Sequence, residues 1–270
     1  MPASPERGFE LPPLIEMAVS IMTSSALFDP YDMKGVHDSF RNALPRFERQ
    51  PPITVLTAAS IVGAPPLVSD AGLPIRWWLS SEDGHDLLQL QETFLAVNWR
   101  RDVAGFNPAA IYPGYDTVAA KAKERVQILR ERALMSGAEL PSPAACEVLY
   151  SNLIPLHDRN GESIPLSEVL AEYKRADKNK QVMGFQMAWN ERIDALAADD
   201  ASVVQVQMVV VGVVKEGGEV VPFVKLDMIA GAVRESWDEC FTFFDVAHAH
   251  IRSRFMALTT ERAHASWLPR

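Results

Sequence analysis

The chain has 270 residues, of which 48% are hydrophobic, and its formal net charge is −9 at pH 7. This length fits one large domain or two closely packed halves, and the apolar content is typical of a globular protein with a sizeable core. The negative charge opposes the electrostatic attraction behind most non-specific nucleic-acid affinity, so we expect no nucleic-acid partner.

Cysteine usage and the N-terminal sequence predict a cytoplasmic protein. The two cysteines, Cys146 and Cys240, lack the spacing of a disulfide framework or a zinc knuckle. The first residues contain prolines and acidic side chains, where a signal peptide needs a basic start and an apolar run. The longest apolar stretch, residues 203–214, is interrupted by two glutamines and is shorter than the ~20 residues that a membrane-spanning helix needs. We therefore expect no membrane partner.

The predicted elements of the first half begin with a strand at residues 14–24, where β-branched and alternating apolar residues occur. A helix follows, with Asp29 as its cap, Pro30 at its first position and Pro45 as its stop. Four strands come next, and the last three form an antiparallel meander. These strands are residues 53–62, 75–81, 86–91 and 93–100. A long helix is predicted over residues 114–137, which are rich in good helix formers.

The second half repeats this order with different residues. Residues 145–156 predict a strand, residues 164–175 a short helix and residues 180–190 another strand. The clearest hairpin joins residues 203–214 to residues 219–233, because "KEGG" between them contains the glycines that tight turns require. The last predicted element is a helix from Trp237 to Leu258.

The repeated order predicts an α+β protein with two similar halves, residues 1–138 and 139–270. Each half would contain a strand, a helix, several antiparallel strands and a long helix, with its helices packed on one face of an antiparallel sheet. Such a pattern suggests internal duplication, and the two halves would form either two units or one intimate domain. A repeat of about 125 residues is too long for a solenoid array, whose units have about 20 to 50 residues.

The stretch "FFDVAHAHIRSRF", residues 243–255, brings Asp245, His248 and His250 close together in the sequence. On an α-helix, successive residues turn by about 100°, so the two histidines point about 160° apart and cannot bind one metal ion. His248 lies near the apolar stripe, which favours a packed histidine whose tautomer is set by Asp245. The alternative is an acid/base His248 that Asp245 orients. We expect no metal and no cofactor.

His264 is the third candidate catalytic residue. It follows the long C-terminal helix in the segment "TTERAHASW". Helix capping by Thr259 or Thr260 and packing of Trp267 explain this segment without chemistry. A catalytic His264 would have to combine with Asp245 and His248 across a cleft.

Trp77 and Trp78 are the candidate binding residues. Neighbouring residues of a strand face opposite sides, so one indole is expected in the core and the other on an outer face, where it can meet a helix, a partner or a ligand. The basic run at residues 174–180 lacks interleaved aromatics and is read as a solvated loop. Residues 80–86, "SSEDGHD", lack the alternation of a calcium loop and are read as a polar hairpin tip.

Several segments resemble a family of sporadically distributed, uncharacterised bacterial proteins of about 250–270 residues. The segments are "LLQLQETFLAVNWR", "YPGYDTVAAKAKE", "YSNLIP" and the C-terminal region from "LDMIAGAV" onward. The matching positions are Asn98, Tyr115, Asn152, His248, Phe255 and Thr260. The resemblance implies no catalytic residues, and a sporadic distribution implies accessory genes such as those of mobile elements, phage defence or toxin neutralisation.

Neither a glycine-rich phosphate loop nor a nucleophile elbow occurs in the sequence. The sequence therefore favours a non-catalytic protein of an accessory system that recognises a protein partner, with a homo-oligomer as a further expectation; the edges of its antiparallel sheet would accept the partner. One alternative is a hydrolase that uses His248 and Asp245. The other is a small-molecule sensor that binds its ligand between the halves, near Trp77 or Trp78.

Overall fold

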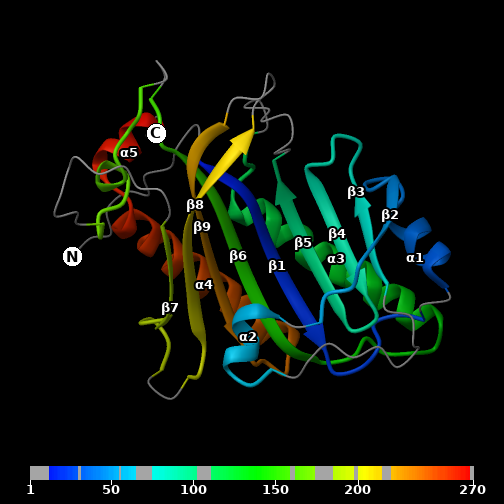
Figure 1. Ribbon diagram of the computed structural model, residues 1–270. Helices are drawn as coiled ribbons and strands as arrows, with labels where there is room; N and C mark the ends of the chain where they lie inside the picture. Colours follow the sequence, from blue (N-terminus) through cyan, green and yellow to red (C-terminus); the bar gives the residue numbers. More distant parts are fainter. Residues whose placement is uncertain are drawn as a thin grey trace.

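A computed structural model describes residues 12–29, 32–54, 56–64, 75–101, 111–158, 162–173, 185–197, 200–214 and 220–267. Within these residues, nine strands form one antiparallel sheet that carries helices (Figure 1). The prediction of an α+β protein with an antiparallel sheet is confirmed. The turn predicted at residues 215–218 and the basic run at residues 174–180 lie outside the described residues.

The strands follow one another across the sheet in an order that differs from their order in the chain. From edge to edge they are β2 (Arg46–Gln50), β3 (Arg76–Ser80), β4 (Asp86–Gln91), β5 (Phe94–Arg100), β1 (Leu14–Thr23), β6 (Pro143–Pro155), β9 (Val220–Ala232), β8 (Val203–Val214) and β7 (Gln186–Arg192). The helices are α1 (Met33–Phe40), α2 (Thr57–Ile61), α3 (Tyr115–Met135), α4 (Trp237–Leu258) and α5 (Glu261–Ser266), with a 3-10 turn η2 at Leu166–Glu168.

The two faces of the sheet are covered differently. The long helices α3 and α4 lie on one face, against β5, β1, β6 and β9, and contact each other. The short helix α2 lies on the opposite face, against β9, β8 and β6 (Figure 1). Side chains of β6 alternate between these faces: Val148 joins the main core under α3 and α4, while Glu147 points to α2. The main core therefore spans both halves of the chain.

The long C-terminal helix has the bounds that the sequence predicts. The Ser236 side chain accepts the N–H of Glu239, and the Glu239 carboxylate accepts the N–H of Ser236, which forms a capping box. Phe243, Phe244 and Ile251 are buried at helical spacing against the sheet. The predicted strands β1, β3, β4, β5 and β6, the β8–β9 hairpin and the long helix α3 are confirmed as well.

The strand predicted at residues 53–62 is wrong, because residues 57–61 form helix α2. The apolar run lies on the sheet instead of joining it. The N–H of Ala59 donates to the buried carboxylate of Glu147 at 2.7 Å. Gly231 of β9 allows this close approach, since a Cβ atom there would lie 2.2 Å from the Ala59 nitrogen.

The helix predicted at residues 164–175 is also wrong, since the segment forms only the 3-10 turn η2. Its backbone bonds to the chain after α4 instead: the N–H of Ala171 donates to the carbonyl of Leu258, and the N–H of Thr260 donates to the carbonyl of Val169. These partners are distant in sequence, so local periodicity does not reveal them.

Three further elements differ from the prediction. Strand β2 was not predicted, because three of its five residues are charged and it is held only by pairing with β3. The N-cap position of helix α1 is Asp32 rather than Asp29, and the Asp32 side chain makes no capping bond there. The Asp29 carbonyl accepts the N–H of Asp32 in a turn before the helix. Strand β7 is Gln186–Arg192 and so extends two residues beyond the predicted range of 180–190. Residues 180–184 of that prediction lie outside the described residues.

Candidate functional site

Helix α4 places the predicted residues Asp245 and His248 beside two tyrosines. The Tyr115 hydroxyl at the start of α3 donates to Asp245 Oδ1 at 2.6 Å. The Tyr115 ring stacks on the imidazole of His248, with centroids 4.1 Å apart and an angle of 2° between the planes. The Tyr150 hydroxyl on β6 lies 2.6 Å from His248 Nδ1. The sequence predicted that Asp245 would pair with His248; in the structure it pairs with Tyr115.

Burial keeps both phenols in their neutral form. Desolvation raises the pKa of Tyr150 well above its ordinary value. It also raises the pKa of Tyr115, and the hydrogen bond to Asp245 adds to that increase. Both hydroxyls therefore stay protonated, and Tyr150 donates to Nδ1 when His248 carries its proton on Nε2. This cluster joins α3, β6 and α4 through oriented polar contacts.

The other two histidines of this region lie elsewhere. His250 points to β7, where its Nε2 lies 3.5 Å from the Glu191 carboxylate that Arg254 also contacts. His264 is buried in α5, with Nε2 2.7 Å from the Thr259 hydroxyl. His264 also lies against the Trp267 ring, with centroids 5.5 Å apart. Asp245 and His248 both contact Tyr115, while the contacts described for His264 are with Thr259 and Trp267.

The two tryptophans of β3 point to opposite faces of the sheet. Trp77 is 7% exposed, belongs to the main core and stacks on Phe47 at 4.8 Å. Trp78 lies on the other face between two guanidinium groups, with Arg100 at 4.6 Å and Arg76 at 5.6 Å from its ring centroid. Trp78 is thus the indole that belongs to a polar surface of the sheet.

A chain of hydrogen bonds crosses four strands on the face that carries Trp78. Arg76 Nη1 and the Trp78 indole N–H both donate to Gln89 Oε1, at 2.9 and 3.2 Å. The Gln89 amide donates to Asn98 at 3.0 Å, and the Asn98 amide donates to Glu16 at 2.6 Å. Burial raises the pKa of Glu16, and the bond from Asn98 opposes that increase. Sequence reasoning missed this chain, although polar residues inside otherwise apolar strands are a usable signal.

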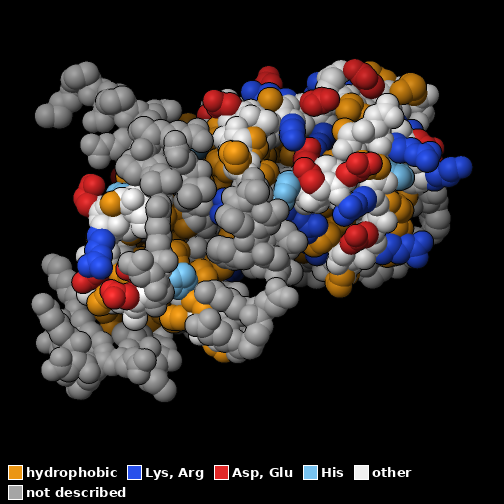
Figure 2. All heavy atoms as spheres, turned by 90° about the horizontal axis from the view of Figure 1, so that it is seen from above, with side chains coloured by type: hydrophobic (Ala, Val, Ile, Leu, Met, Phe, Trp, Pro, Cys, Tyr) orange, Lys and Arg blue, Asp and Glu red, His pale blue; other side chains and the backbone are white. Residues whose placement is uncertain are grey.

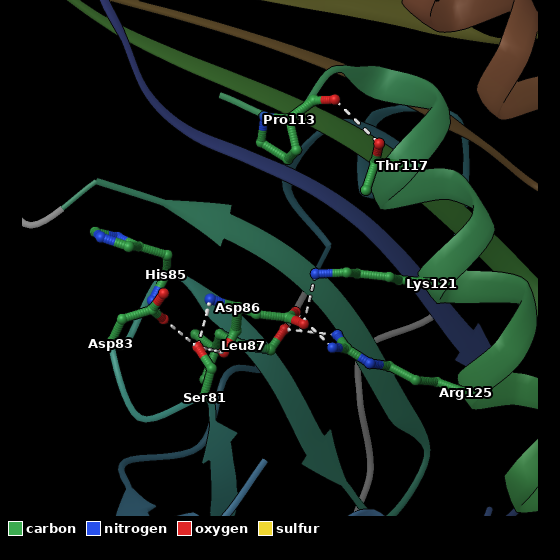
Figure 3. A network of polar contacts seen from close by, with 9 residues as sticks. All are labelled: Ser81, Asp83, His85, Asp86, Leu87, Pro113, Thr117, Lys121 and Arg125. Carbon is green, nitrogen blue, oxygen red and sulfur yellow. Dashed lines mark hydrogen bonds and ion pairs between the residues drawn. The ribbon is translucent and has the colours of Figure 1, made fainter. Parts of the chain in front are cut away.

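The predicted hairpin tip at residues 80–86 is a polar network that reaches α3 (Figure 3). Asp86 begins β4 and pairs with Lys121 at 2.8 Å and with Arg125 at 2.5 Å. At the tip, the Ser81 hydroxyl donates to Asp83 at 2.6 Å. Within the described part of the chain, no group of three or more metal-binding side chains converges. The two ion pairs of Asp86 connect α3 to β4.

A groove of about 480 Å³ lies between α3 and α4, and so between the two halves of the chain. Its sides carry both signs of charge, and the Lys123 ammonium lies 5.4 Å from the Phe241 ring centroid. The lining residues are Lys123, Val126, Gln127 and Arg130 on α3, and Trp237, Asp238, Phe241, Thr242 and Asp245 on α4. The groove contains the predicted Asp245 but neither Trp77 nor Trp78.

The two edges of the sheet are β2 and β7, and they differ in chemistry. Three of the five β2 residues are charged, and prolines at positions 45, 51 and 52 flank the strand. Charges and prolines are the usual means by which an edge is protected from pairing. In β7, the first five residues carry no charge, and Met187 is 43% exposed. Within the described ranges, strand β7 is therefore the less protected edge.

Among the residues that the structure describes, the backbone groups of β7 that do not bond to β8 belong to its even-numbered residues. The N–H of Val210 donates to the carbonyl of Phe185 at 3.0 Å. The register of Gln186 opposite Val209 places Phe185 opposite Val210, so these two form a hydrogen-bonded pair. Because such pairs alternate along an antiparallel ladder, odd-numbered residues bond to β8, while Gln186, Ala188 and Asn190 point their N–H and C=O groups away from the sheet.

Figure 2 shows lysine and arginine side chains interspersed with aspartate and glutamate over the end of the molecule that carries β2 and α1.

Among the described residues, no helix is both long enough and apolar enough to cross a bilayer. Comparisons with protein-family models, curated proteins and solved structures give no match.

Proposed function

We propose that this chain is a non-catalytic protein-interaction component that binds a partner strand at the β7 edge of its sheet. The observation that carries the proposal is the contrast between the two edges: β2 is short, charged and flanked by proline, while β7 begins with five uncharged residues. In strand addition, main-chain hydrogen bonds give affinity and alternate side chains give specificity. β7 offers both, through its outward backbone groups and through Met187 and Trp189.

Contacts with the rest of the molecule hold β7 in place, which favours the binding of a partner strand at this edge. Trp189 packs against the main core, and Glu191 is held by Arg254 of α4 at 2.8 Å. The strand also pairs with β8 over its full length. A preorganised edge loses little conformational entropy when a partner binds, which favours association. The setting in an accessory system comes from the family resemblance and remains part of the proposal.

The test uses the backbone N–H of Ala188. Ala188→Pro removes this outward donor and leaves the bonds to β8 in place, while Ala188→Thr keeps the donor and serves as the matched control. Tagged wild-type and variant chains would be recovered from the native cell and their stoichiometric protein partners measured. We expect recovery of the partner to fall about tenfold with proline, the effect of one or two lost hydrogen bonds, and to persist with threonine. Equal recovery with both variants would refute binding at this edge.

We also infer that the two halves of the chain arose by duplication. Read outward from the centre of the sheet, the first half runs β1, β5, β4, β3, and the second runs β6, β9, β8, β7. In each half the first strand is central, its neighbour is the last strand, and a long helix of 21 or 22 residues follows that last strand. Strand β2 extends the first half only. This order supports the inference.

A second candidate function is small-molecule binding in the groove between α3 and α4. The groove lies between the halves, and its lysine, arginine and aspartate side chains beside two aromatic residues suit a small zwitterionic ligand. Native mass spectrometry of protein purified from its own cell would detect a retained ligand. Loss of that ligand with Lys123→Met would support the groove, and a wild-type protein without bound mass would count against it. The hydrolase alternative gains no support from the pairing of Asp245 with Tyr115.

A further inference from the structure

We infer that the partner strand at the β7 edge is β7 of a second copy of this chain, paired antiparallel about a two-fold axis at Ala188. This inference rests on the proposed strand addition at β7 and names its partner. The two-fold would join two nine-stranded sheets into one continuous sheet.

The backbone of β7 allows few self-pairings. In an antiparallel pair, two residues exchange both hydrogen bonds only if each points its N–H and C=O toward the other strand. On β7 those residues are the even-numbered ones, so the axis must pass through a residue position and place even-numbered residues opposite each other. An axis at Ala188 pairs Ala188 with its own copy and Gln186 with Asn190 of the second copy.

Side chains favour an axis at Ala188 over an axis at Trp189. With this axis, Met187 lies opposite Trp189 of the second copy on the face that carries α4, where thioether and indole make a favourable contact. On the other face, the amides of Gln186 and Asn190 lie opposite each other and match as donor and acceptor. An axis at Trp189 would instead place Met187 opposite the Glu191 carboxylate. The Ala188 register therefore pairs apolar side chains with apolar ones and amides with amides. It places no two charges of the same sign opposite each other.

Symmetry explains why the assembly ends at two copies. A two-fold contact uses the same strand from each copy and leaves no free β7 behind. The remaining edges of the joined sheet are the two β2 strands, with three charged residues in five and flanking prolines. These edges resist further pairing. The expected species is a closed dimer.

The first experiment measures mass by light scattering during size exclusion. The chain has a mass of 29.9 kDa, so wild type and Ala188→Thr are expected at twice that value. Ala188→Pro removes two symmetry-related hydrogen bonds and is expected to raise the dissociation constant by roughly 100-fold. Circular dichroism and a thermal melt would show that the proline variant stays folded. A wild-type monomer at concentrations near 100 μM would overturn the inference.

A cross-linking experiment tests the register. Cα atoms of a hydrogen-bonded antiparallel pair lie about 5.5 Å apart, which suits a disulfide. Under mild oxidation, Ala188→Cys is expected to form a covalent dimer. Gln186→Cys alone is expected to stay monomeric on a denaturing gel, since the two copies of residue 186 would lie about 14 Å apart. The native cysteines, Cys146 and Cys240, are both buried and do not compete. Cross-linking through Trp189→Cys instead would overturn the proposed register.

The two proposals fail separately. If wild type is monomeric and a different protein is recovered with wild type but not with Ala188→Pro, strand addition stands and the second copy is refuted. If wild type forms a dimer that Ala188→Pro leaves intact, pairing at β7 is refuted as the basis of the dimer. If Ala188→Pro changes neither mass nor recovery of any partner, both proposals are overturned.

Discussion

His248 is held by two tyrosines that come from different elements. It stacks on Tyr115 and bonds to Tyr150, which is buried on β6. We expect His248→Ala to lower the free energy of unfolding by about 2 kcal/mol, because it removes an aromatic contact and leaves a buried hydroxyl without this partner. Urea unfolding measures the change. If the variant keeps full stability, these contacts do not stabilise the fold, and His248 is again a candidate functional residue.

A double-mutant cycle separates the stacking from the hydrogen bond. His248→Phe keeps an aromatic ring against Tyr115 and removes the bond to Tyr150, and Tyr150→Phe removes the same bond from the other side. The double variant is expected to cost about 1 kcal/mol less than the sum of the two single variants. Strict additivity would contradict a direct interaction.

Glu147 is expected to make the free energy of unfolding depend on pH. Burial raises its pKa from 4.5 to about 7, although N–H groups of Ala59, Ala58 and Thr57 oppose the increase. The folded protein therefore holds a proton that the unfolded chain releases above pH 4.5. This contribution to stability is complete below the unfolded value and is lost as the pH rises through about 7.

We expect wild type to lose about 3 kcal/mol more stability than Glu147→Gln between pH 4.5 and about pH 8, since each unit of pKa shift corresponds to about 1.4 kcal/mol. Glutamine keeps an oxygen that accepts the N–H of Ala59 and cannot ionise. Denaturant unfolding of both proteins at the two pH values gives the difference. Parallel pH profiles would contradict a raised pKa at Glu147.

At the scale of elements, one aspartate fastens α3 to β4 through two cations of unequal burial. The side chain of Arg125 is 6% exposed and also donates to the carbonyl of Leu87, while that of Lys121 is 38% exposed. We expect Arg125→Met to cost about 3 kcal/mol, because it leaves Asp86 with only its exposed partner. Lys121→Met removes an equal charge and should cost less than about 1 kcal/mol. Equal losses in thermal or urea unfolding would contradict the difference in burial.

Helix α2 shows how tertiary contacts override a local pattern. The run at residues 53–62 is apolar and predicts a strand. In the structure, residues 57–61 form a helix over Gly231, and Ala59 meets Glu147 from a strand 88 positions further along the chain. The same applies to η2, whose backbone partners follow α4. The local sequence does not reveal such distant partners. A few hydrogen bonds to them are enough to favour the observed conformation over the strand or helix that the local pattern predicts.

At the scale of the whole molecule, the halves meet in the centre of the sheet. β1 pairs with β6, α3 contacts α4, and α2 from the first half packs on β6, β8 and β9 of the second. Separate chains of residues 1–138 and 139–270 would expose the apolar edges of β1 and β6. We expect each to be unfolded or aggregated alone and the two to assemble when co-expressed, with one cooperative transition in the intact protein. Calorimetry checks this, and two independent transitions would show autonomous halves.

Elements with a long, repeated pattern can be read from the amino-acid sequence alone. The β3–β5 meander, the β8–β9 hairpin and helices α3 and α4 follow from alternation, turn residues and apolar spacing, since local pattern and burial agree there. The sequence also singled out Asp245, His248, His264 and the adjacent Trp77 and Trp78, without deciding which of the two indoles lies outside the core.

The partners of these residues and the order of the strands depend on tertiary contacts. Tyr115 and Tyr150 reach Asp245 and His248 from positions 130 and 98 residues away, and the chain from Arg76 to Glu16 depends on which strands are neighbours. The identity of the open edge is likewise a property of the assembled sheet, because a strand is an edge only through the absence of a neighbour on one side. Residues this far apart in the sequence become neighbours only when the chain between them closes into a long loop, and a local sequence pattern contains no information about that closure.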